Sequence, residues 1–265
     1  MDALTSPAVS ENCPGIVLLA AGRGERLRPL TENTPKSLLP ICGRPTIGWV
    51  LDAALRTGAT DIVVVTGFRQ DAIRAYIAEN FPGDIGKIQL IHNERYSEDV
   101  NIYSTSLGVE ALKDRSKGYI IIETDLVIER SGWDKIFACG RSGRSFWVTK
   151  GRYSRSLTGG IVRADPAGPI SDIAYVPEYD PAYDGWLKMV GVLGVSPSEV
   201  AADQSWRKAT MKDSIRKYYL ESWVAGLRDL PCVALDLGDS FMMTYNSERD
   251  YMRALDESSN FCGRL

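Results

Sequence analysis

The segment between residues 15 and 40 constrains this chain more than any other stretch does. It opens with an apolar run over residues 16–21, whose length is typical of a buried strand. The run ends in Gly22-Arg23-Gly24, which a strand does not continue comfortably. Glycine adopts positive φ at little cost and lets backbone N–H groups come close to a ligand. A concave array of N–H groups after a strand suits phosphate oxygens, so we expect an anion site here.

The same segment concentrates positive charge in a chain whose formal net charge is -3. Four cations fall within fourteen residues, and these are Arg23, Arg26, Arg28 and Lys36. Glu25 and Glu32 reduce that charge without cancelling it. Concentrated positive charge attracts a polyanion, such as a nucleoside triphosphate. Glycines and charge alone also fit an ordinary surface loop with solvated arginines.

The complete string from Leu19 to Lys36 is more specific. It reads Leu-Ala-Ala-Gly-x-Gly-x-Arg-Leu-x-Pro-Leu-Thr-x-x-x-Pro-Lys, and it lacks the endings of a Walker loop or a dinucleotide fingerprint. The string resembles the signature of the nucleotidyltransferase superfamily, which makes sugar nucleotides and CMP-activated alcohols. The resemblance implies that the loop from Gly22 to Arg26 wraps the triphosphate and that Lys36 bridges the α-phosphate and the incoming nucleophile. The implied nucleotide-binding residues of this loop are Leu19, Ala20, Ala21, Gly22, Arg23 and Gly24.

Composition restricts the other function classes. With 265 residues, of which 44% are hydrophobic, the chain can form one large α/β domain or two small ones. Its mild acidity argues against general nucleic-acid binding, and no apolar run reaches the length of a membrane span. Residues 1–14 lack the basic and apolar regions of a signal peptide, so we expect a flexible N-terminal extension. Five scattered cysteines give no zinc site and fit a reducing cytoplasm, the predicted location.

The order of apolar runs predicts the fold class. Strand patterns at residues 16–21, 61–66, 87–92 and 119–123 are separated by helical patterns at 47–55, 70–80 and 101–112. This alternation is typical of βαβ units with parallel strands. We therefore predict one α/β, doubly wound (Rossmann-like) domain over residues 15–265 with a mixed, mainly parallel central sheet. Residues 15–130 would form the nucleotide-binding half, and residues 131–265 the acceptor-binding half with a smaller β subregion. Helices are also expected at 199–208, 212–227 and 247–255.

The strand at residues 119–123 indicates where a metal would bind. His92 is the only histidine, which excludes a multi-histidine site and leaves carboxylates, the ligands that favour Mg²⁺. A buried strand that ends in Glu123-Thr124-Asp125 is typical of one that delivers a metal ligand, although Asp is also a common helix N-cap. The position of Asp125 resembles that of the superfamily's metal-binding aspartate, with Thr124 in place of the usual glycine.

The loop before the third helical pattern is a candidate for the nucleobase site, because ligands bind at the carboxyl ends of strands in doubly wound sheets. Asn101 and Ser104 would also suit helix capping. Asn101-Ile102-Tyr103-Ser104 resembles the segment around the base in phosphocholine- and phosphonate-type cytidylyltransferases. The resemblance favours CTP, with Asn101, Tyr103, Ser104 and Glu123 as nucleotide-binding residues.

The acceptor site is expected among residues 141–155, which hold five cations and no carboxylate. Such a run fits a solvated basic loop, and it also fits a small acceptor with negative charge beyond its reacting group, since arginine pairs bidentately with anions. Lys188 lies where the superfamily often carries a second substrate lysine, although a strand-edge lysine is an equal alternative. The predicted acceptor-binding residues are Trp147, Lys150, Arg152, Arg155 and Lys188.

The segment 245–251 resembles the superfamily's second metal motif but carries Asn246 where an aspartate is usual. Asn246 is the predicted second metal ligand, although it brings no charge, and Glu123 or a water is the alternative. We predict a cytidylyltransferase that transfers CMP from CTP to a phosphonate or phosphate monoester, with Mg²⁺ as cofactor and Lys36, Arg26 and Asp125 as catalytic residues. The alternatives are a sugar-1-phosphate nucleotidyltransferase using UTP, dTTP or GTP, and a catalytically weak, regulatory nucleotide-binding protein. The sequence leaves open whether the chain forms a homodimer.

Overall fold

The computed structural model of the protein describes residues 13–164 and 168–265. The expected flexible extension lies outside the described residues over positions 1–12. Its last two residues are described, and there Cys13 packs against the main core and Pro14 is buried. No helix in the described ranges is long and apolar enough to cross a membrane.

A nine-stranded sheet organises the chain around β1 (Gly15–Ala20), the apolar run that opens the phosphate-loop segment. Strands β4 (Ile62–Thr66) and β6 (Tyr119–Glu123) flank β1, and β5 (Ile88–His92) pairs with β4. All of these pairs are parallel, so their carboxyl ends meet at one edge of the sheet. That edge carries the loops expected to bind nucleotide.

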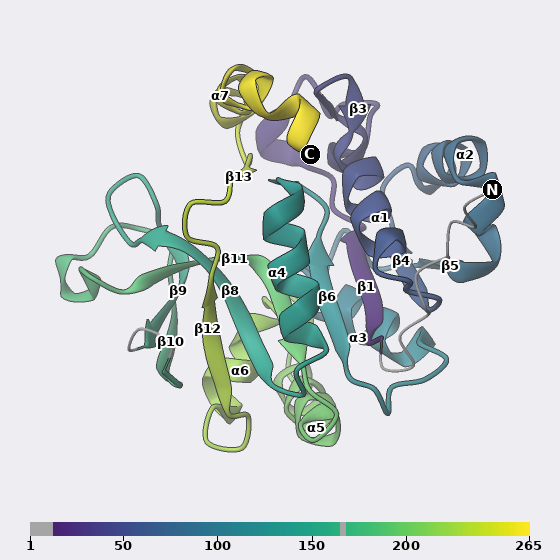
Figure 1. Cartoon of the computed structure of the whole chain (residues 1–265). Helices are drawn as coiled ribbons and strands as arrows, with labels where there is room; N and C mark the ends of the chain where they lie inside the picture. Colours follow the sequence, from purple (N-terminus) through teal and green to yellow (C-terminus); the bar gives the residue numbers. More distant parts are fainter. Residues whose placement is uncertain (1–12, 165–167) are drawn as a thin grey trace, which may run out of the picture.

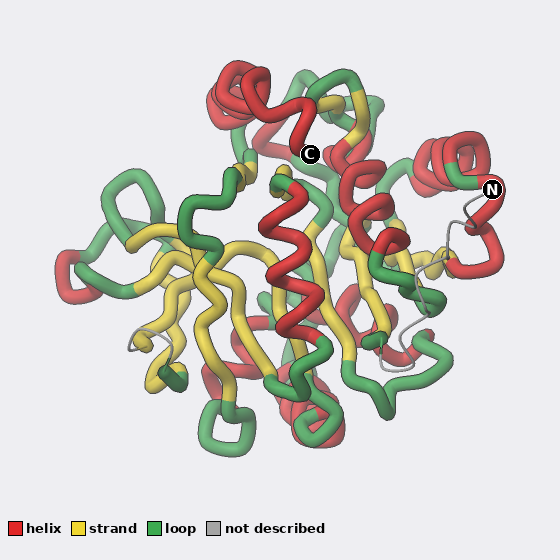
Figure 2. Tube along the Cα trace, viewed as in Figure 1, coloured by secondary structure: helices red, strands yellow, loops and turns green. Residues whose placement is uncertain are grey.

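The other half of the sheet is mainly antiparallel and makes the sheet mixed, as predicted. Strand β11 (Leu187–Val195) pairs antiparallel with β6 and with β8 (Ser145–Arg152). Beyond β11 lie the antiparallel pair β9 (Gly159–Ala164) and β10 (Ile170–Val176), while β12 (Cys232–Asp236) runs parallel to β8. Figures 1 and 2 show this half as a curved extension of the central sheet.

Helices cover both faces of the sheet, as expected for a doubly wound domain. Successive β1 side chains point to opposite faces, so Ile16 and Leu18 join one core cluster and Val17 and Leu19 the other. Figure 1 shows α1 and α4 in front of the sheet and α3 behind it. The first face is covered by α1 (Thr46–Arg56), α2 (Gln70–Asn80) and α4 (Arg130–Gly140), and the second by α3 (Ile102–Ala111), α5 (Val200–Thr210) and α6 (Leu220–Gly226).

A third, smaller core joins the two ends of the described chain. Strand β7 (Leu126–Ile128) pairs with β13 (Met242–Thr244), and Leu27, Ile41 and Tyr245 pack together beside them. A disulfide between Cys42 and Cys262, which sequence reasoning missed, lies in the same region. The remaining elements are the two-residue strands β2 (Pro40–Ile41) and β3 (Arg44–Pro45), the helix α7 (Glu248–Ser258), and the 3-10 helices η1 (Glu25–Leu27), η2 (Lys36–Leu38), η3 (Pro82–Lys87), η4 (Pro181–Tyr183) and η5 (Ser259–Arg264).

The structure differs from the predicted helices in two places. The predicted helix over residues 212–227 is helical only in α6. Its first half is a loop because the Lys217 carbonyl accepts from the backbone N–H groups of Asn101 and Ile102, and the Tyr219 N–H donates to the Asn101 side chain. Helix α4 was not predicted, although the buried Trp133, Ile136 and Phe137 carry a helical spacing.

Candidate active site

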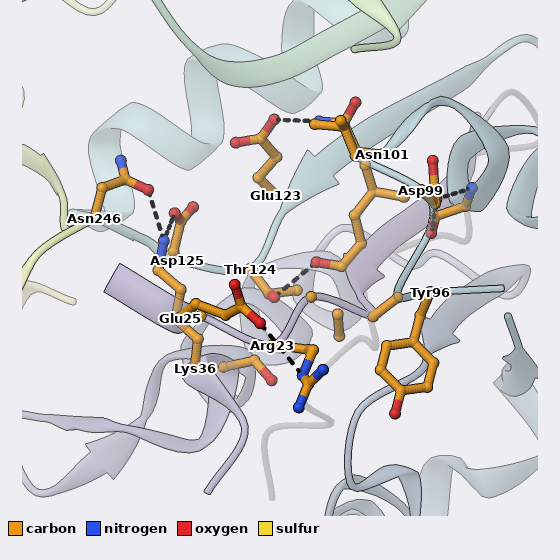
Figure 3. Close-up of a pocket in the computed structure, with 18 of the residues that line it drawn as sticks. Arg23, Glu25, Lys36, Tyr96, Asp99, Asn101, Glu123, Thr124, Asp125 and Asn246 are labelled. Atoms are coloured by element: carbon orange, nitrogen blue, oxygen red, sulfur yellow. Dashed lines mark hydrogen bonds and ion pairs between the residues drawn. The ribbon is translucent and has the colours of Figure 1, made fainter. Parts of the chain in front are cut away.

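A cavity of about 490 Å³ opens at the carboxyl ends of β1 and β6. The glycine loop forms one wall, the start of α3 forms another, and the C-terminal part of the chain contributes Asn246. Figure 3 shows these segments around one space, with Lys36, Asp125 and Asn246 on one side and Tyr96 and Asp99 on the other. Of the predicted nucleotide-binding residues, the lining includes Leu19, Ala20, Ala21, Gly22, Arg23, Gly24, Asn101, Ser104 and Glu123.

Gly24 explains why the loop needs glycine. Its φ of 62° is left-handed, and a Cβ there would lie 3.1 Å from both Lys36 Cβ and Thr31 Cγ2. The Thr31 hydroxyl donates to the Gly24 carbonyl at 2.8 Å and holds the turn in place. A side chain at position 24 would therefore meet both backbone strain and crowding. Arg23 lies beside Glu25 at 3.7 Å, so its charge is partly compensated within the loop.

Lys36 lies at the centre of the charged groups. Its ammonium contacts Asp125 Oδ2 and donates to Asn246 Oδ1 at 2.9 Å. The Arg26 guanidinium donates to the same Asn246 oxygen at 3.2 Å. Asp125 lies 89 positions from Lys36 in the sequence, and Asn246 lies 210 positions from it. The fold brings the three together because Asp125 lies in the turn after β6 and Asn246 follows β13. The structure thus brings together all three predicted catalytic residues, Lys36, Arg26 and Asp125, with Asn246.

The geometry around Asp125 fits a divalent cation. Asp125 is buried, and its second oxygen, Oδ1, has no hydrogen-bond partner in the described part of the chain. A buried carboxylate oxygen without a partner is costly unless a ligand or ion completes it. Oxygen donors from Asp125 and the Asn246 amide suit Mg²⁺. No group of three or more His, Cys, Asp or Glu side chains within residues 13–164 and 168–265 could hold a metal, so a substrate or water would have to supply further ligands.

The end of the cavity beside α3 is organised by Asp99, which sequence reasoning missed. Its carboxylate accepts from the backbone N–H groups of Tyr103 and Ser104 and from Asn93 Nδ2, so it caps α3 from outside the helix. Neither Asn101 nor Ser104 acts as the side-chain cap that the sequence also allowed. The predicted nucleotide-binding Tyr103 does not line the cavity, and its ring lies 5.6 Å from the Arg95 guanidinium.

A second cavity of about 260 Å³ adjoins the first and shares Arg26, Asn101, Glu123, Tyr218 and Asn246 with it. We call it the acceptor cavity. Aromatic side chains form much of its wall, and Trp147 stacks on Tyr219 with ring centroids 5.5 Å apart. At its mouth the hydroxyl of Tyr175 donates to that of Tyr218 at 2.9 Å. No sequence signal marked these tyrosines, because they come from β10 and from the loop before α6.

Glu123 and Lys188 are the two ionisable groups that distinguish this cavity. Burial raises the pKa of Glu123 to about 7, and the charge of Asp125 acts in the same direction. Burial lowers the pKa of Lys188 to about 8, which the charge of Glu123 only partly offsets. Both shifts have the sign expected when burial removes a charged group from water. Lys188 and Trp147 are thus the predicted acceptor residues that the structure brings to this site.

The three other predicted acceptor residues lie elsewhere. Lys150 donates to the Gly238 carbonyl, and Arg152 donates to the Gly185 carbonyl at 2.6 Å. Arg155 lies over the ring of Tyr179 at 4.3 Å. None of them lines either cavity, because the last part of β8 and the loop after it extend past the cavity into the exposed hairpin region. We therefore correct the expectation and leave these three cations out of the site.

Sequence comparisons place the chain near known transferases. A family model described as "Domain of unknown function (DUF6564)" matches residues 49–146. A 2-aminoethylphosphonate cytidylyltransferase from Lancefieldella rimae is 36% identical over 112 residues, or 42% of this chain and 43% of the relative. A choline-phosphate cytidylyltransferase from Streptococcus pneumoniae is 33% identical over 105 residues, or 40% of this chain and 42% of the relative. The matched segments thus span less than half the length of these relatives.

Comparison of structures extends the likeness over the whole fold. The CTP:phosphocholine cytidylyltransferase of Streptococcus pneumoniae has a TM-score of 0.75 and 22% identity, covering 92% of this chain and 99% of the other. A UDP-glucose pyrophosphorylase complexed with UDP-glucose has a TM-score of 0.78 and 15% identity, covering 94% and 99%. At these identities the likeness concerns the fold. The resemblance to the nucleotidyltransferase superfamily is confirmed.

Proposed function

We propose that this chain transfers CMP from CTP to a phosphonate or phosphate monoester and releases pyrophosphate. The observation that most supports this proposal is that Lys36, Asp125, Asn246 and Arg26 lie together where the two cavities meet. The first two line the larger cavity, and the last two line both cavities. A triphosphate in the larger cavity and an acceptor in the smaller one would meet at this group.

The reaction needs no general base from the protein. An oxygen of the acceptor attacks the α-phosphorus of CTP, a new P–O bond forms, and the bond to the β-phosphate oxygen breaks with its electrons leaving on pyrophosphate. The attacking oxygen is already largely ionised at neutral pH, because the second pKa of such groups is about 6. Catalysis is then a matter of positioning and charge compensation.

The residues of this chain divide that work. Lys36 would contact both anions and offset their repulsion, which is largest as the new bond forms. Arg26 and the backbone N–H groups of the glycine loop would bind the β- and γ-phosphates that depart. Asp125, with the Asn246 oxygen, would hold Mg²⁺. The ion, when bound, would neutralise charge on the phosphates as a Lewis acid.

CTP is the proposed nucleotide. Asn101 and Ser104, from the segment that resembles the base site of cytidylyltransferases, do line the larger cavity. The two curated relatives described above are both named as cytidylyltransferases, which supports the same nucleotide. The identity of the nucleotide as CTP and that of the metal ion as Mg²⁺ are both proposed.

A sugar-1-phosphate nucleotidyltransferase is the second candidate. The likeness in fold to UDP-glucose pyrophosphorylase favours it. The two relatives described above, both named as cytidylyltransferases, support the first candidate.

Pyrophosphate release with CTP, UTP, dTTP and GTP against a panel of phosphonates, phosphocholine and sugar phosphates tests the proposal. We expect turnover with CTP and a phosphonate or phosphate monoester, and none for Asp125→Ala. Equal turnover of CTP and UTP, or a preference for glucose 1-phosphate, would refute it. Undiminished activity of a soluble Asp125→Ala protein would show that Asp125 does not hold the metal.

A further inference from the structure

Besides Arg26, which also lines the larger cavity, the acceptor cavity holds two opposite charges that do not pair with one another. Glu123 and Lys188 both line it and both are partly buried. The ion pairs within 4.0 Å among the described residues include neither of these two side chains. Charges removed from water without a partner are costly, so two such groups facing one cavity call for a ligand that completes both.

Lys188 has donor capacity left for a ligand. Its ammonium donates to the carbonyls of Gly160 at 3.1 Å and of Met189 at 2.6 Å. These two bonds fix the head group against β9 and β11. An ammonium carries three N–H donors, so one remains. Both of these partners are neutral, and within residues 13–164 and 168–265 no carboxylate lies within 4.0 Å of the ammonium.

Glu123 has acceptor capacity left. Its Oε1 accepts from Asn101 Nδ2 at 3.3 Å, and that asparagine is itself held by the Tyr219 N–H at 2.9 Å. Gly191 faces the carboxylate so closely that a Cβ would lie 2.5 Å from Glu123 Cδ and Oε2, so the side chain is confined between β6 and β11. The Tyr219 side chain also hydrogen-bonds to this carboxylate. A carboxylate offers about four acceptor sites, more than these contacts use.

The positions of the two groups show which part of an acceptor they would contact. Lys36 and Asp125 line the nucleotide cavity and not the acceptor cavity. Lys188 lines the acceptor cavity and not the nucleotide cavity, while Glu123 lies at the boundary. The reacting phosphoryl group must lie beside Lys36. Lys188 therefore faces the far part of the acceptor, with Glu123 between it and the reaction centre.

We propose that the acceptor's tail carries both an ammonium group and a carboxylate, as an α-amino acid does. This inference rests on the proposed function. Glu123 binds the ammonium, Lys188 binds the carboxylate, and the rings of Tyr175, Tyr218 and Tyr219 add favourable contacts to the cation. An acceptor with one of the two groups leaves a buried charge unmatched.

Four phosphonates test the inference. They are 2-amino-3-phosphonopropionate with both groups, 2-aminoethylphosphonate with the amine only, 3-phosphonopropionate with the carboxylate only, and ethylphosphonate with neither. Hydrogen bonds to charged groups predict a gain in kcat/KM of about tenfold or more for each matched group. The compound with both groups should exceed either single one by that factor with CTP.

Three variants assign the effect to residues. Glu123→Gln should remove the preference for the amine and keep that for the carboxylate, and Lys188→Met should do the reverse. Lys150→Met removes a cation that lines neither cavity and should retain both preferences. If 2-aminoethylphosphonate equals 2-amino-3-phosphonopropionate, or if Lys188→Met keeps the carboxylate preference, the inference is wrong.

Calorimetry with the same four compounds and CMP separates this inference from the proposed function. Turnover of any of the four compounds with CTP supports cytidylyl transfer whatever their ranking. Graded binding without turnover would uphold the recognition of the tail and overturn the reaction. Equal or undetectable binding of all four compounds would overturn the inference about the tail, even if another phosphate ester is turned over.

Discussion

At the scale of single residues, Lys36 contacts both groups that are proposed to hold the metal ion. Its ammonium contacts Asp125 Oδ2 and the Asn246 oxygen, the two groups predicted to be metal ligands. The ring of Tyr245 lies 5.3 Å from the same ammonium. If these oxygens bind a divalent ion as proposed, the Lys36 ammonium competes with that ion for them.

Replacing Lys36 with Met should therefore tighten metal binding in the absence of nucleotide. The variant keeps a side chain of similar length and removes the competing charge, so Mn²⁺ affinity should rise about tenfold or more, which is about 1.4 kcal/mol. The intensity of the free Mn²⁺ signal in electron paramagnetic resonance measures it. Lys87→Met is the matched control, because it removes an equal charge from an exposed pair with Asp84. Equal affinities of the two variants would contradict the competition.

At the scale of elements, the start of α3 forms part of the wall of the larger cavity, where the nucleotide is proposed to bind. Asp99 accepts from two backbone N–H groups at the first turn of α3 and from the Ser104 hydroxyl at 2.7 Å. These bonds place Ser104 at the cavity wall and hold the buried Asn93 against it. Hydrogen bonds within the protein therefore fix the shape of this segment.

Asp99→Ala should weaken CTP binding and stability together. Loss of a helix cap costs about 1–2 kcal/mol, and Asn93 would lose a partner as well. We expect a lower melting temperature and a raised KM for CTP, with a smaller change in the KM for the acceptor. Asp114→Ala, which removes a similar turn contact with the exposed Ser116, is the control for the kinetic effect. An unchanged KM for CTP would show that the base loop does not need this cap.

Helices and strands whose apolar residues recur with a clear period were predictable from the sequence. The four parallel strands and the first three helices lie within one or two residues of their expected bounds, because each carries its own apolar pattern. The loop at residues 212–219 was not predictable, since its shape depends on hydrogen bonds to Asn101, more than a hundred positions away. Partners of that kind leave no local trace in the sequence.

The residues of the candidate site likewise fall into those that sequence motifs predicted and those that only the tertiary fold reveals. Lys36, Arg26 and Asp125 stand in motifs, and the structure brings them together as predicted. The acceptor side was misplaced because the basic run at residues 141–155 is a local feature, whereas the cavity is built from β6, β10, β11 and the loop before α6. Only the tertiary fold shows that Glu123 faces both cavities.

At the scale of the whole molecule, the C-terminal segment closes onto the N-terminal loop. The Tyr245 hydroxyl donates to the Lys36 carbonyl at 3.1 Å, and the Tyr251 hydroxyl donates to the Pro40 carbonyl at 2.7 Å. Ser247 and Asp250 form a capping box that begins α7 directly after Asn246. The Cys42–Cys262 disulfide fastens the far end of this segment across a separation of 220 residues.

The disulfide should therefore support both stability and the position of Asn246. Cross-links over long loops typically contribute about 2–4 kcal/mol, since they restrict the unfolded chain. We expect a reductant to lower the melting temperature of the wild-type protein and to leave that of Cys262→Ser unchanged. Amide hydrogen exchange in α7 and around Lys36 should accelerate on reduction, while exchange in β1 and β4 should change least, because the central sheet has its own core. Two results would show that the disulfide does not hold this segment in place. One is an equal change of the melting temperature with reductant in both proteins. The other is faster amide exchange throughout the sheet without faster exchange in α7.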